Sequence, residues 1–383
     1  MHHPARTILA SFAALLVLAV TASAGDEFLV YFGTYTGMKS GSKGIYVSKF
    51  NAASGELGAP ELAAETGSPS FLEIHPSKKF IYAVGEMGTP QAKGGGVTAF
   101  SVSLPSGKLT PINQVSAVGQ GPCHVNIDKT GKLAMIANYG SGSCASYAIK
   151  DDGSLGEAAS FHQHEGQGAN PRRQAGPHAH SANFSPDNKF AFVCDLGLDK
   201  VMIYKIAPAT GTTVPHGEGR VPDASGPRHF AFHPNGRFAF VNNEMAMTET
   251  TFAYDPDKGT LTEVATVSTV PAADRNKEGL STAETRVHPN GKFVYVSNRG
   301  HDTIAVFSCD PATGRLKLLD NVNCEGRTPR NFNLDPSGRW AVVAHQDGNS
   351  VALFKVDAET GRLAFTGKKL VVGGPCCVRF LAL

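Results

Sequence analysis

The stretch HPNGRFAFVNN (233–243) joins a Pro-Asn-Gly turn to a run of aromatic and β-branched residues. Such a pattern is typical of a hairpin that leads into a buried strand. Five further copies are HPSKKFIYAVG (75–85), DKTGKLAMIAN (128–138), SPDNKFAFVCD (185–195), HPNGKFVYVSN (288–298) and DPSGRWAVVAH (335–345). A strand of the same kind without the turn, FLVYFGTY (28–35), brings the number of such strands to seven.

Two other motifs also recur seven times. The first is a turn of the form x-x-G-x-L, with copies at ASGEL (53–57), PSGKL (105–109), DGSL (152–155), DKGTL (257–261), ATGRL (312–316) and ETGRL (359–363) and a degenerate copy at PATG (208–211). The second marks the start of a strand, with copies at SPSFL (68–72), GPCHV (121–125), GPHAHS (176–181), GPRHF (226–230), TAETRV (282–287), TPRNF (328–332) and GPCCV (374–378). A period near fifty residues with four short strands per unit is typical of propeller blades.

The two ends of the chain match different strands of one repeat. The final residues, CVRFLAL (377–383), match the innermost strand, whereas FLVYFGTY (28–35) matches the second strand. The termini therefore build one composite blade, and strand pairing closes the ring without open edges. We predict an all-β fold, a seven-bladed β-propeller that spans residues 25–383. A parallel β-helix or a two-domain sandwich does not explain a chain that begins at strand two and ends at strand one.

Residues 1–24 have the form of a cleaved signal peptide. Arg6 provides the positive start, residues 8–20 form a short uncharged apolar run, and Ala22-Ser23-Ala24 is a small-x-small cleavage site. The run is too short for a lasting membrane anchor. We expect an exported protein, periplasmic or secreted, with no membrane attachment after cleavage, and an uncleaved anchor is the alternative.

Composition restricts the possible partners. The chain is 41% hydrophobic and 18% charged, with a formal net charge of +2 and no basic tract, so nucleic acid is not an expected partner. The seven cysteines show no CxxC pattern, and their odd number leaves at least one without an intramolecular partner. We expect a monomer.

Antiparallel strand order sorts the polar residues between the two rims of the ring. The start of strand one and the end of strand two lie at one rim, and the HPNG-type turns lie at the other. Six residues before the turn position, which is the proline of each copy or Lys129, stand Ser70, Cys123, His180, Arg228, Ala283 and Arg330, and one residue later stand His124, His229 and Glu284. Nine or ten residues after the turn position stand Glu86, Asn138, Asp195, Glu244, Arg299 and His345.

The first rim therefore gathers three arginines, several histidines and several carboxylates. Any one of these residues is ordinarily solvated or paired with a neighbour. Three arginines near one axis, however, repel one another unless an anion lies between them. Guanidinium groups bind carboxylates and phosphates through paired hydrogen bonds, so we predict a site for a small acidic molecule at this rim.

The segment HQHEGQGANPRRQAGPHAH (162–180) passes over the same rim and contains two H-x-H pairs. A metal site needs further ligands at fixed spacing, and none stands out, so we expect neither a metal nor a cofactor. A loop rich in glycine and arginine better suits a lid or an anion clamp. Three residues before the turn position stand Glu73, Asn126, Asn183, Arg286 and Asn333. These five could line a wet tunnel or bond one another between blades, and we favour the second interpretation.

Six stretches together carry a family resemblance: YFGTYT (31–36), HEGQGANPRRQAGPHAHS (164–181), GPRHFAFHPNGRF (226–238), VNNE (241–244), SNRGHD (297–302) and TPRNF (328–332). From about Phe28 to Leu383 the chain resembles the seven-bladed propeller lactonases, which include propeller-type 6-phosphogluconolactonases and fungal 3-carboxy-cis,cis-muconate lactonizing enzymes. The resemblance implies that His180, Arg228, Glu244 and Arg299 are catalytic. We assign substrate binding to His124, Asn138, His178, Glu284, Arg330 and His345.

The resemblance implies hydrolysis of a small acidic lactone, a sugar-acid lactone as in 6-phosphogluconolactonases. Water deprotonated by Glu244 or His180 attacks the ring carbonyl, and Arg228 and Arg299 stabilise the oxyanion. Muconate-type lactonizing cycloisomerisation and a non-catalytic exported scaffold remain as alternatives. A scaffold would expose aromatic anchors, whereas the single tryptophan, Trp340, lies in a predicted strand. Because 6-phosphogluconate chemistry is cytosolic, an exported chain departs from the family pattern, which counts against a phosphorylated substrate.

Overall fold

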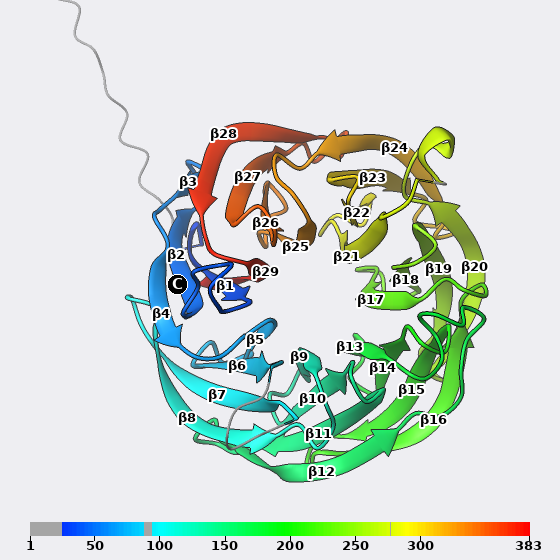
Figure 1. Ribbon diagram of the computed structural model, residues 1–383, viewed down its shortest axis with the longest axis horizontal. Coiled ribbons are helices and arrows are strands. Elements are labelled where there is room, and N and C mark those ends of the chain that lie inside the picture. Colours follow the sequence, from blue (N-terminus) through cyan, green and yellow to red (C-terminus); the bar gives the residue numbers. More distant parts are fainter. Residues whose placement is uncertain (1–24, 88–93, 276) are drawn as a thin grey trace, which may run out of the picture.

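The computed structural model describes residues 25–87, 94–275 and 277–383, which form seven β-sheets arranged around one axis (Figure 1). The predicted seven-bladed propeller is confirmed. The predicted signal peptide, residues 1–24, lies outside the described residues. In the described ranges the one helical element is a 3-10 turn, η1 (Ala272–Asp274), and no helix has the length and apolar character needed to cross a membrane.

Six blades are four-stranded antiparallel sheets made of consecutive strands. Blades 1 to 3 contain β5 (Leu72–Ile74), β6 (Phe80–Gly85), β7 (Gly96–Ser103), β8 (Lys108–Ser116), β9 (Pro122–Ile127), β10 (Leu133–Asn138), β11 (Ser143–Ile149), β12 (Leu155–Gln163), β13 (Ala179–Phe184), β14 (Phe190–Asp195), β15 (Lys200–Ala207) and β16 (Thr212–Arg220). Blades 4 to 6 contain β17 (Pro227–Phe232), β18 (Phe238–Asn243), β19 (Thr248–Asp255), β20 (Thr260–Ser268), β21 (Ser281–Val287), β22 (Phe293–Arg299), β23 (Thr303–Cys309), β24 (Leu316–Asn323), β25 (Pro329–Leu334), β26 (Trp340–His345), β27 (Ser350–Val356) and β28 (Leu363–Val371).

Blade 7 is built from both ends of the chain. Its innermost strand is β29 (Pro375–Ala382), which pairs with β1 (Glu27–Thr34), which in turn pairs with β2 (Gly44–Asn51). The short strands β3 (Glu56–Leu57) and β4 (Glu61–Glu65) both pair with β2. Phe28 stands opposite Ala382 and Phe32 opposite Val378, so six consecutive residues of β1 are in register with the last strand. The predicted closure by a composite blade is confirmed.

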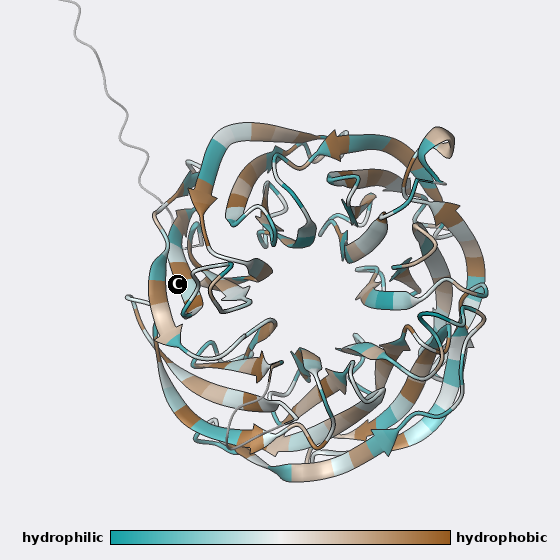
Figure 2. Ribbon diagram, in the orientation of Figure 1, coloured by the Kyte–Doolittle hydropathy of each residue, from teal (hydrophilic) through white to brown (hydrophobic). Residues whose placement is uncertain are grey.

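The position of a strand in its blade explains its sequence. The second strands, such as β10 (LAMIAN) and β14 (FAFVCD), are buried along their whole length because neighbouring blades cover both of their faces. The outermost strands alternate between hydrophilic and hydrophobic residues, since one of their faces meets solvent (Figure 2). Buried second strands and half-exposed outermost strands together allow the seven sheets to pack against one another around a common axis.

The x-x-G-x-L turn is the contact point between neighbouring blades. In blade 2, Gly153 has a φ of 83°, and a Cβ there would come within 2.4 Å of the Phe80 ring of blade 1. The hydroxyl of Tyr82, also from blade 1, donates to the Gly153 carbonyl at 2.8 Å. Blades 5 and 6 repeat the arrangement, with the Tyr295 hydroxyl 3.0 Å from the Gly361 carbonyl. Glycine is required at this turn because the aromatic residues of the adjacent second strand occupy the space.

Candidate functional site at one mouth of the ring

A cavity of about 200 Å³ lies at the end of the ring where the first strands begin. We name it the carboxylate mouth, and its lining residues are Glu86, Cys123, Tyr139, His180, Glu244, Arg299 and Arg330. A narrow extension shares Cys123, His180 and Arg330 with it and adds Tyr35, Ser70, Phe71, Arg228, His229 and Cys376. Three of the four predicted catalytic residues thus line the cavity, and the fourth, Arg228, lines its extension.

Antiparallel pairing brings the central residues together. Pro227 at the start of β17 pairs with Asn243 at the end of β18, which places Arg228 beside Glu244. The Nε of Arg228 donates to Oε2 of Glu244 at 3.0 Å, and Nη2 of Arg299 reaches the same oxygen at 2.9 Å. From the overlying loop, Nη2 of Arg173 donates to Oε1 of Glu244 at 2.9 Å. One carboxylate therefore binds three guanidinium groups.

Glu244 is the anion that this cluster of arginines requires. Its side chain is 8% exposed, and that of Arg228 is 2% exposed. Burial alone would raise the pKa of Glu244, but Arg299, Arg228, His180 and Arg173 hold it well below its ordinary value. A carboxylate held ionised in this way is a weak proton acceptor. The structure therefore argues for Glu244 as a counter-ion and against Glu244 as the base.

His180 is the histidine of the cavity. Its Nε2 lies 3.9 Å from Oε2 of Glu244, and its Nδ1 lies 3.8 Å from the Sγ of Cys123. Burial, followed by the charge of Arg228, lowers the pKa of His180 well below its ordinary value, so the ring is neutral at neutral pH. A neutral imidazole has a nitrogen lone pair that can accept a proton. Burial also raises the pKa of the Cys123 thiol, which excludes a thiolate nucleophile at neutral pH.

Two donors in the cavity are not used by carboxylates. The Nε of Arg299 is buried and has no hydrogen-bond partner among the described residues. Arg330 forms no ion pair within the described ranges; its Nη2 donates to the Tyr35 hydroxyl at 3.1 Å, and its guanidinium carbon lies 5.4 Å from the centre of the Tyr35 ring. A buried donor without a partner costs about 1–3 kcal/mol. A ligand oxygen bound in this cavity would recover that free energy.

The loop at residues 162–180 is fastened at both ends to one carboxylate. Oδ2 of Asp195 lies 2.6 Å from Nδ1 of His164, and Oδ1 accepts from the backbone N–H of His178 at 2.8 Å. Between these ends the loop carries Arg173, whose Nη2 reaches both Glu244 and the Tyr139 hydroxyl, the latter at 3.1 Å. Arg173 of this loop therefore binds a carboxylate of the protein itself, and the role of the loop as a lid or an anion clamp stays a prediction.

The structure places the predicted substrate-binding residues at different depths. Arg330 lines the cavity, and His178 stacks behind Tyr139 with ring centres 4.6 Å apart. Deeper in the ring, His124 stacks on Phe71 at 4.0 Å. Glu284 lies at the same depth, and its Oε2 is 3.0 Å from Nδ1 of His229. His124 and Glu284 are therefore not part of the cavity lining.

Asn138 and His345 are not brought to the cavity. Nδ2 of Asn138 donates to the Ala117 carbonyl at 3.1 Å, and Nε2 of His345 lies 2.6 Å from the Cys324 carbonyl. Both stand nine residues after the turn position, whereas Glu244 stands ten residues after it. Successive residues of a strand point to opposite faces, so a difference of one residue turns the side chain away from the axis. We correct the assignment of these two residues to substrate binding, because they hold connecting loops.

The same count identifies two residues that sequence reasoning missed. Tyr139 stands ten residues after Lys129 and lines the cavity. Tyr35 directly follows β1, whose last residue Thr34 pairs with Pro375 as Asn243 pairs with Pro227. Sorting the strand ends by this offset would have found both tyrosines.

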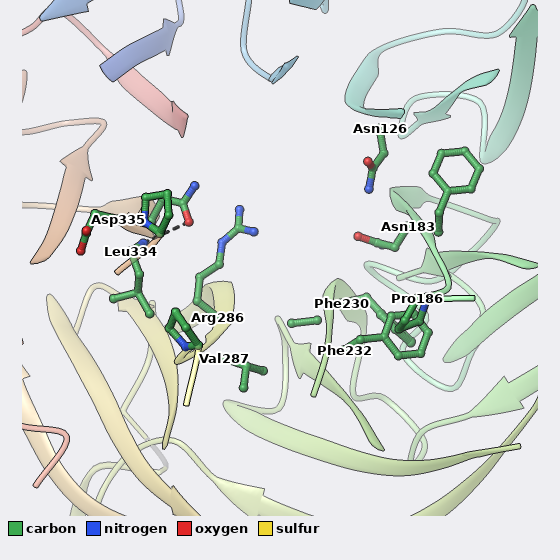
Figure 3. A pocket seen from close by; sticks show the side chains of 14 residues that line it. Asn126, Asn183, Pro186, Phe230, Phe232, Arg286, Val287, Leu334 and Asp335 are labelled. Atoms are coloured by element: carbon green, nitrogen blue, oxygen red, sulfur yellow. Dashed lines mark hydrogen bonds between the residues drawn. The ribbon is translucent and has the colours of Figure 1, made fainter. Parts of the chain in front are cut away.

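The opposite end of the ring contains a wider cavity of about 440 Å³, which we name the asparagine mouth (Figure 3). Its polar lining includes Asn126, Asn183, Arg286 and Asn333, and the figure shows Asn183 and Arg286 pointing into the opening from opposite sides. Nδ2 of Asn333 donates to the Val378 carbonyl of the neighbouring blade at 3.3 Å. The favoured interpretation, in which these residues bond one another between blades, is therefore wrong for Asn126, Asn183 and Arg286. It fits Glu73, whose Oε2 accepts from Nε of Arg379 at 3.1 Å.

The described residues contain neither a disulfide bond nor a cluster of side chains suited to bind a metal ion. All seven cysteines are buried and free. The described part of the chain contains no group of three or more His, Cys, Asp or Glu side chains arranged to hold a metal ion.

Comparison with known proteins agrees with this geometry. Residues 29–380 match the family model described as lactonase, 7-bladed beta-propeller. The 6-phosphogluconolactonase of Bacillus subtilis is 35% identical over 306 residues, which cover 80% of this chain and 84% of that protein.

Two solved structures are similar over almost their whole length. A putative 6-phosphogluconolactonase from Bacteroides fragilis has a TM-score of 0.86 and 32% identity, and the match covers 94% of this chain and 99% of that one. The periplasmic gluconolactonase of Pseudomonas aeruginosa has a TM-score of 0.86 and 31% identity, with 93% and 99% covered. The resemblance predicted from the sequence is confirmed, and the chain belongs to the seven-bladed β-propeller lactonase family.

Proposed function

We propose that this protein hydrolyses a sugar-acid lactone and is a carboxylic-ester hydrolase of the 6-phosphogluconolactonase type. The observation that carries the proposal is the carboxylate mouth, where a neutral His180, a buried Glu244 and an unpartnered Nε–H of Arg299 meet around one cavity. The names of the Bacillus subtilis and Bacteroides fragilis relatives support the same reaction class.

In the proposed reaction His180 accepts a proton from water while the water oxygen bonds to the ring carbonyl carbon. The resulting imidazolium is stabilised by Glu244, whose Oε2 lies 3.9 Å from the ring nitrogen. Arg299 and Arg330 donate to the oxyanion, and one well-placed donor of this kind contributes about 3–4 kcal/mol. The tetrahedral intermediate then breaks the ring C–O bond, and the imidazolium returns its proton to the ring oxygen. The product is an open-chain hydroxy acid.

Glu244 and Arg228 have supporting roles in this scheme. Glu244 neutralises the guanidinium groups around it and so allows them to lie close together. Arg228 also donates to the Ala283 carbonyl of the next blade, which fixes its position below the cavity. Each therefore acts by holding other groups in place.

The test is a hydrolysis assay corrected for the spontaneous opening of the lactone. Wild-type protein is assayed with glucono-δ-lactone, 6-phosphoglucono-δ-lactone and a muconolactone, and His180→Gln is assayed in parallel. We expect hydrolysis of a sugar-acid lactone and a loss of kcat of about 10²-fold or more in the variant. Wild-type rates no faster than the spontaneous reaction on both sugar lactones would refute the proposal, and turnover of the muconolactone alone would favour the lactonizing alternative.

We also propose that the chain is exported after cleavage behind Ala24 and acts as a monomer. The form of residues 1–24 supports export, and one structural relative is named a periplasmic protein. N-terminal sequencing of the protein from fractionated cells tests the first point, with an N-terminus at Gly25 as the expected result. Light scattering of the purified protein tests the second, and a mass of two or more chains would contradict it.

A further inference from the structure

The carboxylate mouth has two walls of different chemistry. One wall is the cluster around Glu244, in which both carboxylate oxygens already bind guanidinium groups. The second wall consists of Arg330 from blade 6, Tyr35 from blade 7 and Glu86 from blade 1. The proposed reaction uses the first wall and, from the second wall, Arg330, and it leaves Glu86 without a role.

Glu86 is held by a single neutral group. The Tyr35 hydroxyl donates to its Oε2 at 2.8 Å and accepts from Nη2 of Arg330 at 3.1 Å. No cation of the described residues lies within ion-pair distance of Glu86, in contrast to Glu244 with its three arginines. The side chain of Glu86 therefore faces the cavity as a carboxylate that can still accept hydrogen bonds from a ligand.

The charges of the lining residues limit what this wall can bind. In the first wall three guanidinium groups surround the one carboxylate of Glu244, whereas in the second wall the carboxylate of Glu86 faces the single guanidinium of Arg330. A dianionic phosphate placed against the second wall would meet the carboxylate of Glu86, and like charges in partly buried surroundings repel by several kcal/mol. The hydroxyl groups of an uncharged sugar lactone can instead donate hydrogen bonds to the carboxylate of Glu86.

We propose that Glu86 is a specificity-determining residue that selects unphosphorylated, polyhydroxylated lactones over phosphorylated ones. This inference rests on the proposed lactonase function. With the ring carbonyl at His180 and Arg299, the remote hydroxyl groups of the lactone extend to the second wall. Tyr35 is a positioning residue, because its hydroxyl links the carboxylate of Glu86 to the guanidinium of Arg330.

The experiment compares kcat/KM for glucono-δ-lactone with kcat/KM for 6-phosphoglucono-δ-lactone. We expect wild type to prefer the unphosphorylated lactone, and we expect Glu86→Gln to shift the ratio of the two values toward the phosphorylated lactone by about ten-fold or more. Tyr35→Phe should shift the ratio in the same direction by less. Glu65→Gln, at an exposed carboxylate of β4, is the matched control and should leave the ratio unchanged.

The outcomes separate this inference from the proposed function. A ratio that is unchanged in Glu86→Gln, or a wild-type preference for the phosphorylated lactone, would overturn the inference and leave the lactonase function intact. An equal loss of kcat on both lactones would also overturn it, because Glu86 would then take part in the chemistry. Hydrolysis of neither lactone by wild type would refute the proposed function itself. Thermal melts of each variant check that all are folded.

Discussion

The two mouths of the ring are lined by the same inner strands, yet they differ in almost every physical respect. The asparagine mouth encloses about 440 Å³ and is lined by amides, one arginine and the proline-containing turns. The carboxylate mouth encloses about 200 Å³ and contains two carboxylates, two arginines and a histidine. Between them lies a cluster of aromatic rings, in which Phe71, His124 and His229 have centres 4.0 to 5.6 Å apart.

The comparison shows that size does not identify the reactive end of this ring. The smaller cavity has the buried ion pairs of Glu244 and the neutral histidine. A buried arginine Nε without a partner among the described residues occurs at both ends, on Arg299 and on Arg286. At the larger cavity, Arg286 is ion-paired with Glu284 at 3.3 Å, and Nδ2 of Asn183 donates to the Ser181 hydroxyl at 3.0 Å. Perturbed ionisable groups are the better guide to a functional site.

The largest effect is expected on stability, from Glu244→Gln. Removing this charge leaves Arg228 and Arg299 buried without a counter-ion, so the free energy of unfolding should fall by about 3–5 kcal/mol. Because the folded pKa of Glu244 lies below its ordinary value of 4.5, its contribution is present above that pH and is lost as the pH falls through the folded pKa. Urea denaturation at pH 7 measures the loss, and a variant as stable as wild type would mean that the arginines do not need this anion.

The next effect contrasts one arginine from each mouth. Arg330→Met removes the cation that has no carboxylate partner at the carboxylate mouth, and kcat/KM should fall by about 10²-fold or more. Arg286→Met is the matched change at the asparagine mouth, and kcat/KM should stay within about two-fold of wild type. The lactonase assay measures both, and equal losses would contradict the assignment of the site to one mouth.

A third effect concerns the loop at residues 162–180, which passes over the carboxylate mouth. Burial lowers the pKa of His164, but its hydrogen bond to Asp195 and the neighbouring Cys144 outweigh burial and raise the pKa to about 9. Since this value exceeds the ordinary 6.5, the contribution to stability is complete below pH 6.5 and is lost as the pH rises to about 9. It amounts to at most about 3 kcal/mol.

His164→Gln should remove that pH dependence. Urea denaturation at pH 6 and at pH 9 is the measurement, and wild type should lose more free energy of unfolding between the two pH values than the variant does. Identical losses in the two proteins would show that the His164–Asp195 pair does not hold the loop through its charge.

The smallest effect is expected from Arg173→Ala. The side chain of Arg173 is 45% exposed, so its ion pair with Glu244 should contribute less than about 1 kcal/mol to stability. As part of the loop over the cavity it should affect KM more, and we expect KM to rise about two- to five-fold with kcat nearly unchanged. A large fall in kcat would instead place Arg173 among the reacting groups.

The sequence was sufficient for the ring and for most of the site. The spacing of the turns predicted seven blades. The closure of the ring was predicted because the first strand of the chain matches the second strand of a repeat and the last strand matches the innermost one. Both predictions follow from strand order alone. Arg228 and Glu244 were predicted together because antiparallel pairing fixes which strand ends are neighbours. The ion pair between Arg228 and Glu244 could not be predicted in the same way, because it depends on side-chain distances that a repeat pattern does not give.

The assignment of Asn138 and His345 to the site has one physical cause, which is that the alternation of side chains along a strand was not taken into account. Asn138 and Tyr139 are adjacent in the chain, but Asn138 bonds a connecting loop while Tyr139 lines the cavity. Treating offsets of nine and ten as equivalent therefore included Asn138 and His345 and left out Tyr139. The contact of Arg173 with Glu244 could not be predicted, because Arg173 lies in an irregular loop that has no strand register.

The composite blade also constrains the order of events during folding. Its innermost strand, β29, follows every other strand in the order of the chain, while its partner β1 precedes them all. The other blades can pair their strands as they emerge from the ribosome, but β1 must wait with one edge unpaired until β29 has been synthesised. A chain that stops before Pro375 would keep that edge exposed, and exposed edges are the usual starting point of aggregation.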